Sequence, residues 1–157
     1  MEITDRKWKS NDLIHIQAAW LDYCRAASRS DMLLKKDAEA KMKEWLVQRS
    51  RDPQTLGLVA EADGAFAGFL IARIDEWDSV PPVIEPRRIG IIDALYVLEA
   101  FRRHGIATQL INNATERMRA AHVVAIETIY DAWNPASDLT WRRAGFAPWM
   151  VHAYRML

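Results

Sequence analysis

A strand, a basic glycine-containing turn and a long helix follow one another in the second half of the chain. The run Ile89–Leu98 is nearly all apolar apart from Asp93, and it leads through Arg-Arg-His-Gly-Ile-Ala at 102–107 into an amphipathic helix ending near Ala121. A second short apolar run, Val123–Ile129, comes after the helix. Two strands joined through a helix can pair in parallel. This order predicts a βαβ unit, which neither an all-helical nor a purely antiparallel fold contains.

Two helices and a hairpin are predicted before this unit. Apolar residues recur at helical spacing from Leu13 to Ala27 and again between Asp37 and about Ser50. From Leu56 onward the pattern changes to the short apolar runs Leu56–Ala62 and Phe66–Ile74. Asp-Gly at 63–64 lies between them, and this dipeptide is a strong hairpin signal. The chain therefore opens with helices and continues with an antiparallel pair of strands.

The last part of the chain predicts a short helix and further strand. Asn134 and Pro135 have the residue types of an N-cap and a first helical position, and Gly145 has the type that follows a helix end. From Phe146 to Leu157 the alternation predicts one or two strands that close the sheet. No repeat, linker or low-complexity segment divides the chain. Residues 1–157 are therefore expected to form a single domain.

Composition narrows the classes of function. The 21 basic and 21 acidic side chains cancel, so no global field attracts nucleic acid or an anionic membrane. The single cysteine, Cys24, cannot form an internal disulfide. The first residues contain no apolar signal core, and no run reaches about 18 uncharged apolar residues. We expect a cytoplasmic protein that binds its ligands at a local site and uses no metal ion.

The turn at 102–107 has the chemistry of a phosphate site. Backbone N–H groups at a helix N-terminus have no intrahelical partner, and the helix dipole adds partial positive charge there. Gly105 and the small Ala107 allow a diphosphate to approach the backbone closely. The alternative is an ordinary strand-to-helix turn with a basic rim. The side chains that add charge or hydrogen-bond donors are Arg102, Arg103, His104 and Thr108.

Two separated segments resemble signatures of the GNAT superfamily of N-acetyltransferases. Residues 102–107 are similar to its acyl-CoA motif, which reads Arg or Gln, two residues, Gly, one residue, Gly or Ala, and follows a strand ending like Leu95-Tyr96-Val97. Asn134, a short helix and Arg143-Ala144-Gly145-Phe146 resemble the second signature. The order of elements matches over nearly the whole chain and is weakest near Ile3–Trp8. The motifs of Rossmann and P-loop sites are absent.

The resemblance implies an α/β (α+β) GNAT fold with a mixed central sheet of six to seven strands, about four helices and a splay between the fourth and fifth strands. It implies acetyl-CoA as cosubstrate, with the backbone of Tyr96 and Val97 binding the pantetheine arm like an added strand. Asn134 is expected to contact the cosubstrate, or merely to cap its helix. The predicted cofactor-binding residues are Leu95, Tyr96, Val97, Arg102, Arg103, His104, Gly105, Ile106, Ala107, Thr108 and Asn134.

Asp93 is the candidate for handling the acceptor proton. An amine attacks only when unprotonated, and deprotonating a lysine-like ammonium at neutral pH costs about 4 to 5 kcal/mol. A neighbouring carboxylate can take or relay that proton. Some relatives that acetylate polyamines and drugs carry a carboxylate at this place, four residues before Val97. The alternative is a structural salt bridge from Asp93 to Arg87 or Arg88.

The chain departs from the family at Trp141. Many members place a tyrosine seven residues after the asparagine, as the acid that protonates the departing CoA thiolate. An indole N–H donates a hydrogen bond but does not release its proton near neutral pH. A thiolate with a pKa around 8.5 is a tolerable leaving group, and Tyr130 or Tyr154 could substitute. The candidate catalytic residues are Asp93, Tyr130 and Trp141.

The resulting expectation is transfer of an acetyl group from acetyl-CoA to a primary amine of a small molecule or peptide, by direct attack. A rival is an acyl-CoA-binding or interaction module of the same fold whose chemistry lapsed when tryptophan took the tyrosine position. A nucleic-acid-binding domain fits the zero net charge poorly. A homodimer is expected from relatives that pair through terminal strands. Four tryptophans either stack on the acceptor or pack in the core: Trp77, Trp133, Trp141 and Trp149.

Overall fold

Five strands form one mixed sheet in chain order from edge to edge. The computed structural model describes residues 1–27, 33–77, 83 and 85–155. The first four strands pair antiparallel, and the fifth joins the fourth in parallel, as predicted. The strands are β1 (Ile3–Lys7), β2 (Thr55–Ala62), β3 (Ala65–Trp77), β4 (Arg87–Val97) and β5 (Ala125–Thr128).

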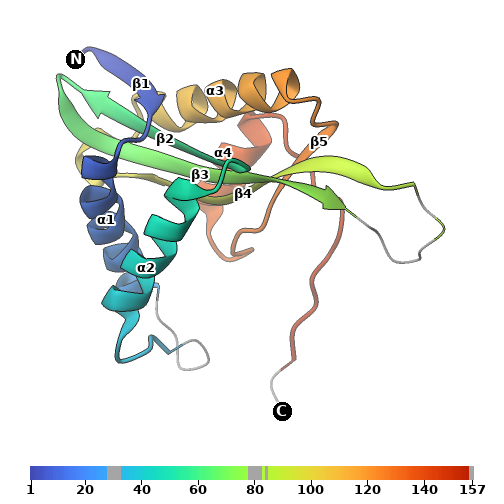
Figure 1. Cartoon of the computed structure of the whole chain (residues 1–157), viewed down its shortest axis with the longest axis horizontal. Coiled ribbons are helices and arrows are strands. Elements are labelled where there is room, and N and C mark those ends of the chain that lie inside the picture. Colours follow the sequence, from blue (N-terminus) through green and yellow to red (C-terminus); the bar gives the residue numbers. More distant parts are fainter. Residues whose placement is uncertain (28–32, 78–82, 84, 156–157) are drawn as a thin grey trace.

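Helices cover both faces of the sheet. Figure 1 shows α3 along one side of the sheet and α1 with α2 on the other. The four predicted helices are confirmed as α1 (Leu13–Ala26), α2 (Ala38–Arg51), α3 (Ile106–Ala120) and α4 (Pro135–Arg143). Two single 3₁₀ turns, η1 (Ser10–Asp12) and η2 (Glu99–Phe101), precede α1 and α3. None of the helices in the described ranges is long and apolar enough to span a bilayer.

Alternate residues of the central strands supply two separate cores. Leu58 and Leu70 pack against α3, whereas the next residues along the chain, Val59 and Ile71, pack against α1 and α2. Successive strand residues point to opposite faces, so an uninterrupted apolar run is what a strand covered on both sides requires. α4 joins the α3 side, where Trp141 belongs to the core. The result is a three-layer arrangement with the sheet in the middle.

The hairpin between β2 and β3 has the predicted turn. Asp63 and Gly64 have φ angles of 48° and 79°. Left-handed geometry at both central residues matches the right-handed twist of the flanking strands, and Asp-Gly adopts it readily. Residue types at the turn thus fix the pairing of these two strands.

The predicted count of six to seven strands is wrong, because the described residues form five. No strand is assigned between 146 and 155, although this segment alternates as a strand would. Figure 1 shows it running away from the sheet toward the C-terminus. A strand exists only where its backbone reaches another strand's free edge. Alternation alone does not provide that edge, and residues 156 and 157 of the predicted segment lie outside the described residues.

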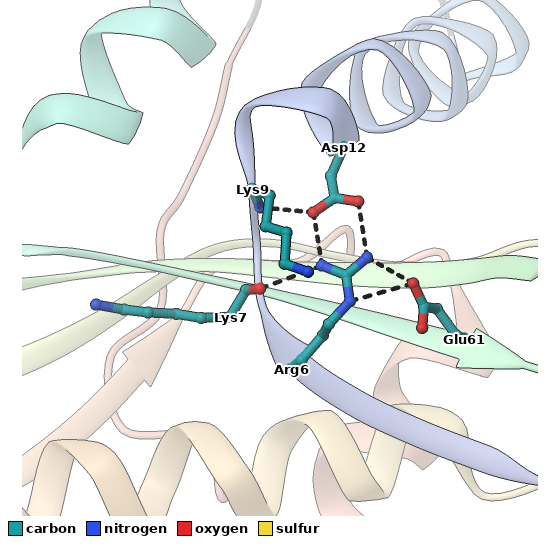
Figure 2. A network of polar contacts seen from close by, with 5 residues as sticks. All are labelled: Arg6, Lys7, Lys9, Asp12 and Glu61. Carbon is teal, nitrogen blue, oxygen red and sulfur yellow. Dashed lines mark hydrogen bonds and ion pairs between the residues drawn. The ribbon is translucent and has the colours of Figure 1, made fainter. Parts of the chain in front are cut away.

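A charged network ties the first strand to its neighbours (Figure 2). The guanidinium of Arg6 donates to both carboxylate oxygens of Asp12, at 2.7 and 3.0 Å, and also to Glu61. The backbone N–H of Lys9 donates to Asp12 as well, at 2.6 Å. These hydrogen bonds, that from Arg6 above all, lower the pKa of the buried Asp12 carboxyl, and the two carboxylates raise the pKa of Arg6. The network joins β1, η1 and β2.

Candidate active site

The β4 and β5 strands separate halfway along β4. Their parallel pairing runs from Ile89 opposite Ala125 to Ile92 opposite Thr128. β4 continues to Val97, so its edge toward β5 has no ladder partner beyond Ile92. This is the predicted opening between the fourth and fifth strands. Unpaired strand edges present N–H and C=O groups that an extended ligand can bind as an added strand.

The free edge of β4 lies between two well-packed side-chain rows. Leu95 and Val97 pack against the α3-side core, and Tyr96 points to the α1 side, with its ring centroid 6.3 Å from that of Phe69 and 5.9 Å from that of Tyr23. The side chains of residues 95–97 therefore pack in the two cores. What the predicted pantetheine-binding residues offer at the opening is their backbone.

The turn between β4 and α3 forms a concave row of N–H donors. Gly105, the N-cap of α3, has φ 82°, and Arg103 has φ 66°. The first helical hydrogen bond is donated by Gln109 to Gly105, at 3.0 Å. Within the described ranges, the N–H groups of residues 103–108 have no acceptor. Such left-handed turns at a helix N-terminus are anion nests.

The basic side chains of the turn divide into two roles. Nε of Arg102 donates to the carbonyl oxygen of Val97 at 3.1 Å, and its guanidinium lies 5.7 Å from the centroid of the Tyr96 ring. Arg102 is thus folded back on the end of β4. Arg103 and His104 are exposed on the rim, where Nδ1 of His104 lies 3.4 Å from the Phe101 carbonyl oxygen. Their charge and donors remain at the surface of the nest.

The residues of the turn fit a diphosphate. Unpartnered N–H groups, two left-handed residues and a cationic rim together match its charge and size. Ile106 contributes only its backbone, because its side chain is buried in the core. Gly105 and Thr108 also line an open groove that continues along α3. That groove is polar, and Gln109 closes one side by donating to Asp5 at 2.5 Å.

Asp93 lies at an irregularity where the opening begins. Ile71 pairs with Ala94 and the next residue, Ala72, pairs with Ile92, so Asp93 is the extra residue of a β-bulge. Bulges re-aim side chains and are frequent beside active sites. Asp93 does form a salt bridge, which was the alternative to a catalytic role, but its partner differs from the predicted one. The ion pair joins Asp93 to Arg73, and neither Arg87 nor Arg88 takes part.

Only one oxygen of the Asp93 carboxylate is paired. Oδ1 accepts from Nη1 of Arg73, whereas Oδ2 is buried and has no hydrogen-bond partner among the described residues. Arg73 also lies within 4.0 Å of Asp75. The side chain of Asp93 is 20% exposed. A carboxylate with one oxygen fixed and a buried oxygen left unpaired has an unused acceptor for a cation or a proton.

Tyr130 follows β5 and is fixed to α4. Its hydroxyl donates to Oδ1 of Asp138 at 2.7 Å, and Oδ2 of the same carboxylate accepts from Nε of Arg142 at 2.8 Å. The hydrogen bond to Asp138 raises the pKa of Tyr130, because it stabilises the protonated phenol beside a negative charge. Tyr154, the other candidate, is exposed in the C-terminal segment.

Asn134 caps α4, which was one of the two roles predicted for it; the other was contact with the cosubstrate. Its side-chain oxygen accepts from the backbone N–H of Ser137 at 3.2 Å, and Pro135 occupies the first helical position. Gly145, with φ 87°, ends the helix region in the predicted left-handed conformation. The capping bond uses the carbonyl oxygen of Asn134. Its amide donors are left for another partner.

Trp141 lies in the core and does not line the opening. The indole is 6% exposed and meets Phe146 edge-on, with 5.0 Å between ring centroids. Core packing, the second alternative for the tryptophans, is therefore confirmed for Trp141. Trp133 in contrast is largely exposed. Trp77 and Trp149 contact each other and Arg87.

Sequence reasoning missed three side chains near the site: Arg73, Asp138 and Arg142. Arg73 was the only charged residue inside the run Phe66–Ile74, which was a usable signal, but its partner depends on the register between β3 and β4. Asp138 and Arg142 are four residues apart on one helix face. Their link to Tyr130 depends on how α4 packs, and the sequence does not state that.

A mixed sheet whose parallel pair opens beside an anion nest is the arrangement that an α/β acyltransferase of the resembled family is expected to have. Comparison with known proteins agrees: the acetyltransferase (GNAT) family model matches residues 16–146. An uncharacterized N-acetyltransferase from Archaeoglobus fulgidus is 32% identical over 116 residues, 74% of this chain and 72% of that protein. The chain belongs to the acetyltransferase (GNAT) family and is an N-acetyltransferase, an acyltransferase.

Solved structures share the fold at low identity. A transcriptional regulator from Bacillus halodurans C-125 matches with a TM-score of 0.79 and 18% identity, over 99% of this chain and 100% of that one. The aminoglycoside acetyltransferase AAC(6')-Iy, bound to the bisubstrate analog CoA-S-monomethyl-acetylneamine, matches with a TM-score of 0.74 and 20% identity, over 100% and 99%. The likeness extends over the whole domain.

Proposed function

We propose that this N-acetyltransferase transfers an acetyl group from acetyl-CoA to a primary amine of a small molecule or peptide, by direct attack of the amine on the thioester. The observation that carries the proposal is the position of the Asp93 bulge. It lies where β4 and β5 part, and the free edge of β4 runs from it to the anion nest before α3. A proton-handling carboxylate, a strand edge and a diphosphate site follow one another along the chain.

The cosubstrate is assigned to the edge and the nest. In this proposal the N–H groups of residues 103–107 hold the diphosphate, and the backbone of Tyr96 and Val97 binds the pantetheine arm in the opening. Asn134, whose amide donors are not used by its capping bond, contacts the cosubstrate from the β5 side. Thr108, in the first turn of α3, adds a hydroxyl donor. Positioning of the two reactants supplies much of the rate.

The acceptor ammonium is assigned to Asp93. Arg73 holds Oδ1, and in this proposal the Asp93 side chain presents its unpartnered Oδ2, buried in the unliganded protein, to the amine and takes or relays its proton. Proton removal from an ammonium with a pKa near 10.4 costs about 4 to 5 kcal/mol at neutral pH. A fixed carboxylate beside the nitrogen gives that proton a path away as the new C–N bond forms.

The departing thiolate is assigned to Tyr130. A phenol ordinarily has a higher pKa than a thiol, about 10 against about 8.5, and the bond to Asp138 raises the pKa of Tyr130 further. Full proton transfer to the sulfur is therefore unfavourable. The phenol instead stabilises the thiolate by donating a hydrogen bond after its hydroxyl rotates away from Asp138. Trp141, packed in the core, takes no part in proton transfer.

A second candidate function is an acyl-CoA-binding module without turnover. The observation that favours it is the burial of Trp141, which leaves no acid at the position where many relatives have one. The two functions differ in one measurable respect, since only the enzyme releases a free thiol when acetyl-CoA is mixed with an amine.

The experiment combines ligand-induced stabilisation with turnover. Acetyl-CoA should raise the melting temperature, because a ligand that binds only the folded state stabilises it. Gly105→Glu should remove most of that rise and the thiol release. Gly64→Glu is the matched control: both glycines have φ near 80° and open space around the missing Cβ, so both substitutions carry the same backbone strain. Equal rises in both variants would place the diphosphate elsewhere.

The C-terminal segment supports a homodimer as part of the proposal. Met150, Val151 and Tyr154 are exposed apolar residues on a segment without secondary structure, and β5 has a strand on only one of its edges. Clustered exposed apolar side chains and an open strand edge are both features that association covers. A second copy is expected to cover these apolar side chains and the open edge of β5.

A further inference from the structure

A small pocket lies on the sheet face that α1 and α2 leave uncovered. It has a volume of about 100 Å³ and is lined by Trp77, Arg87, Ile89, Ala125, Ile126, Glu127 and Trp149. Trp77 is four residues after Arg73 on β3, so both side chains point to the same face. Arg73 contacts Asp93. The pocket and the carboxylate proposed to hold the amine therefore share one face of the sheet.

The guanidinium of Arg87 lies against two tryptophan rings in this pocket. Its guanidinium carbon lies 4.6 Å from the ring centroid of Trp77 and 5.2 Å from that of Trp149, and the two indoles meet edge-on at 5.5 Å. Cation–π contacts of this kind orient a guanidinium without using its hydrogen bonds. The two aromatic rings thus hold the guanidinium without using its hydrogen-bond donors.

The side-chain donors of this guanidinium have no partner in the part of the chain that the structure describes. Arg87 makes no hydrogen bond or ion pair with a described residue, and its Nε is buried without an acceptor. Neighbouring carboxylates are engaged elsewhere: Glu76 pairs with Arg88 at 3.3 Å, and Asp75 lies within 4.0 Å of Arg73. Glu127 lines the same pocket but lies beyond ion-pair distance from Arg87. A buried donor of this kind is costly unless an acceptor arrives.

The contacts of Arg87 with Trp77 and Trp149 determine the charge of the ligand that this pocket can bind. The faces of Trp77 and Trp149 that turn toward Arg87 already hold a cation, so they do not stack on a cationic acceptor. A planar guanidinium with a free edge is the group that binds carboxylates through two parallel hydrogen bonds. The free donors of Arg87 are therefore complementary to a carboxylate, and Glu127 is the one acidic residue among those that line the pocket.

Length restricts the acceptor further. Asp93 lies six residues beyond Arg87 on β4, and six residues of strand span about 20 Å. In a free α-amino acid the amine and the carboxylate are attached to the same carbon, so one molecule cannot reach both places. An extended peptide covers at most about 3.3–3.6 Å per residue. About six residues therefore bridge the distance.

We propose that the acceptor is a short peptide whose N-terminal amine lies at Asp93 and whose C-terminal carboxylate binds Arg87 between Trp77 and Trp149. This assignment rests on the proposed function, and it names the substrate class of the same site. Arg87 is a binding residue that selects the acceptor and takes no part in acetyl transfer.

Matched peptides test the proposal with the unmodified protein. Glycine and its peptides of up to eight residues are compared as free acids and as C-terminal amides, with thiol release as the readout. The free acids should have a kcat/KM at least about ten-fold higher than the amides, because a charge-assisted paired hydrogen bond is lost with the charge. The difference should be largest near six residues. Equal values for acid and amide at every length would overturn the proposal.

Two variants locate the effect. Arg87→Met keeps a flexible side chain between the indoles but removes the charge and the donors; it should abolish the preference for acids and leave the KM for acetyl-CoA unchanged. Arg88→Met is the control, because Arg88 adjoins Arg87 in the chain and pairs with Glu76 outside the pocket. Retained preference in Arg87→Met, or its loss in Arg88→Met, would overturn the assignment to Arg87.

Failure of the proposed function looks different. If no peptide or amine released thiol and acetyl-CoA did not raise the melting temperature, both the acetyl transfer and the peptide acceptor would be wrong. If thiol were released equally with amides, acids and simple amines, the transfer would stand and only the carboxylate site would be wrong.

Discussion

At the residue scale, the bulge at Asp93 changes what a single carboxylate can do. In a regular strand, Asp93 would point to the face opposite both of its neighbours and would have a partner in β3. The extra residue removes that partner and leaves the side chain free to turn toward Arg73. One oxygen is then fixed and the other remains without a hydrogen bond. The ion pair thus orients the group and does not fully neutralise it.

Replacing Asp93 separates this chemistry from structure. Asp93→Asn should lower turnover at neutral pH by about a hundred-fold, within the range for general-base catalysis, and should leave acetyl-CoA binding intact. The defect should shrink at high pH, where more of the amine is already unprotonated. Steady-state kinetics across pH give the test. Arg73→Gln breaks the same ion pair but keeps the carboxylate; equal, pH-independent losses in the two variants would assign Asp93 to structure.

Trp141 gives a second prediction at this scale. Trp141→Tyr should lower stability by about 2 kcal/mol, because it removes core volume and buries a hydroxyl without a partner. The melting temperature should fall by about 4 to 8 °C, and turnover should not rise. Trp141→Phe is the control, since it removes similar volume without adding a hydroxyl, and it should be milder. Higher turnover in Trp141→Tyr with unchanged melting would show that this position reaches the site.

Individual site residues were predictable only where their roles are local. Asn134 caps the helix that its own neighbours form, and Gly105 has the left-handed conformation that its place before α3 requires. Asp93 was recognised as a lone carboxylate in an apolar strand, but its partner Arg73 is set by a register shift between two strands. A register shift leaves no periodic signal in either strand.

At the scale of elements, too, the features that depend on local sequence were predictable and those that depend on distant partners were not. The helices follow from apolar spacing within each segment, and the β2–β3 hairpin follows from its turn residues. The predicted terminal strand failed because a strand needs a partner edge, which lies far away in the chain. β1, the weakest match in the sequence, is present because β2 offers it an edge and because Arg6 fastens it.

Arg6 makes that attachment testable. Arg6→Met should lower the free energy of unfolding by about 2 kcal/mol, less than for a fully buried pair because the Arg6 side chain keeps 30% exposure. The cost arises because Asp12 remains buried without its guanidinium. Arg25→Met is the control: its pair with Asp22 is exposed on both sides, at 57% and 71%, so the change should be about 0.5 kcal/mol or less. Urea unfolding of both variants measures the difference.

The pH dependence of this difference has a definite sign. The pKa of Asp12 is lowered in the folded protein, so its contribution is complete above the ordinary carboxyl pKa near 4 and is lost as pH falls through the lowered value. The gap between wild type and Arg6→Met should therefore be constant near neutrality and shrink below about pH 4. A gap that persists undiminished in acid would mean that Arg6 acts through packing.

At the scale of the whole molecule, the C-terminal segment and the open edge of β5 predict association. Zero net charge gives no long-range repulsion between copies, and Val151, 91% exposed, projects an apolar side chain into solvent. Light scattering during size-exclusion chromatography should give twice the mass of 18.0 kDa. Val151→Lys should shift the protein toward one copy, because association would bury an unpaired charge. Ile14→Lys, at an exposed position on α1, is the control and should leave the mass unchanged. If the wild type and both variants eluted with the mass of one copy, the predicted dimer would be wrong.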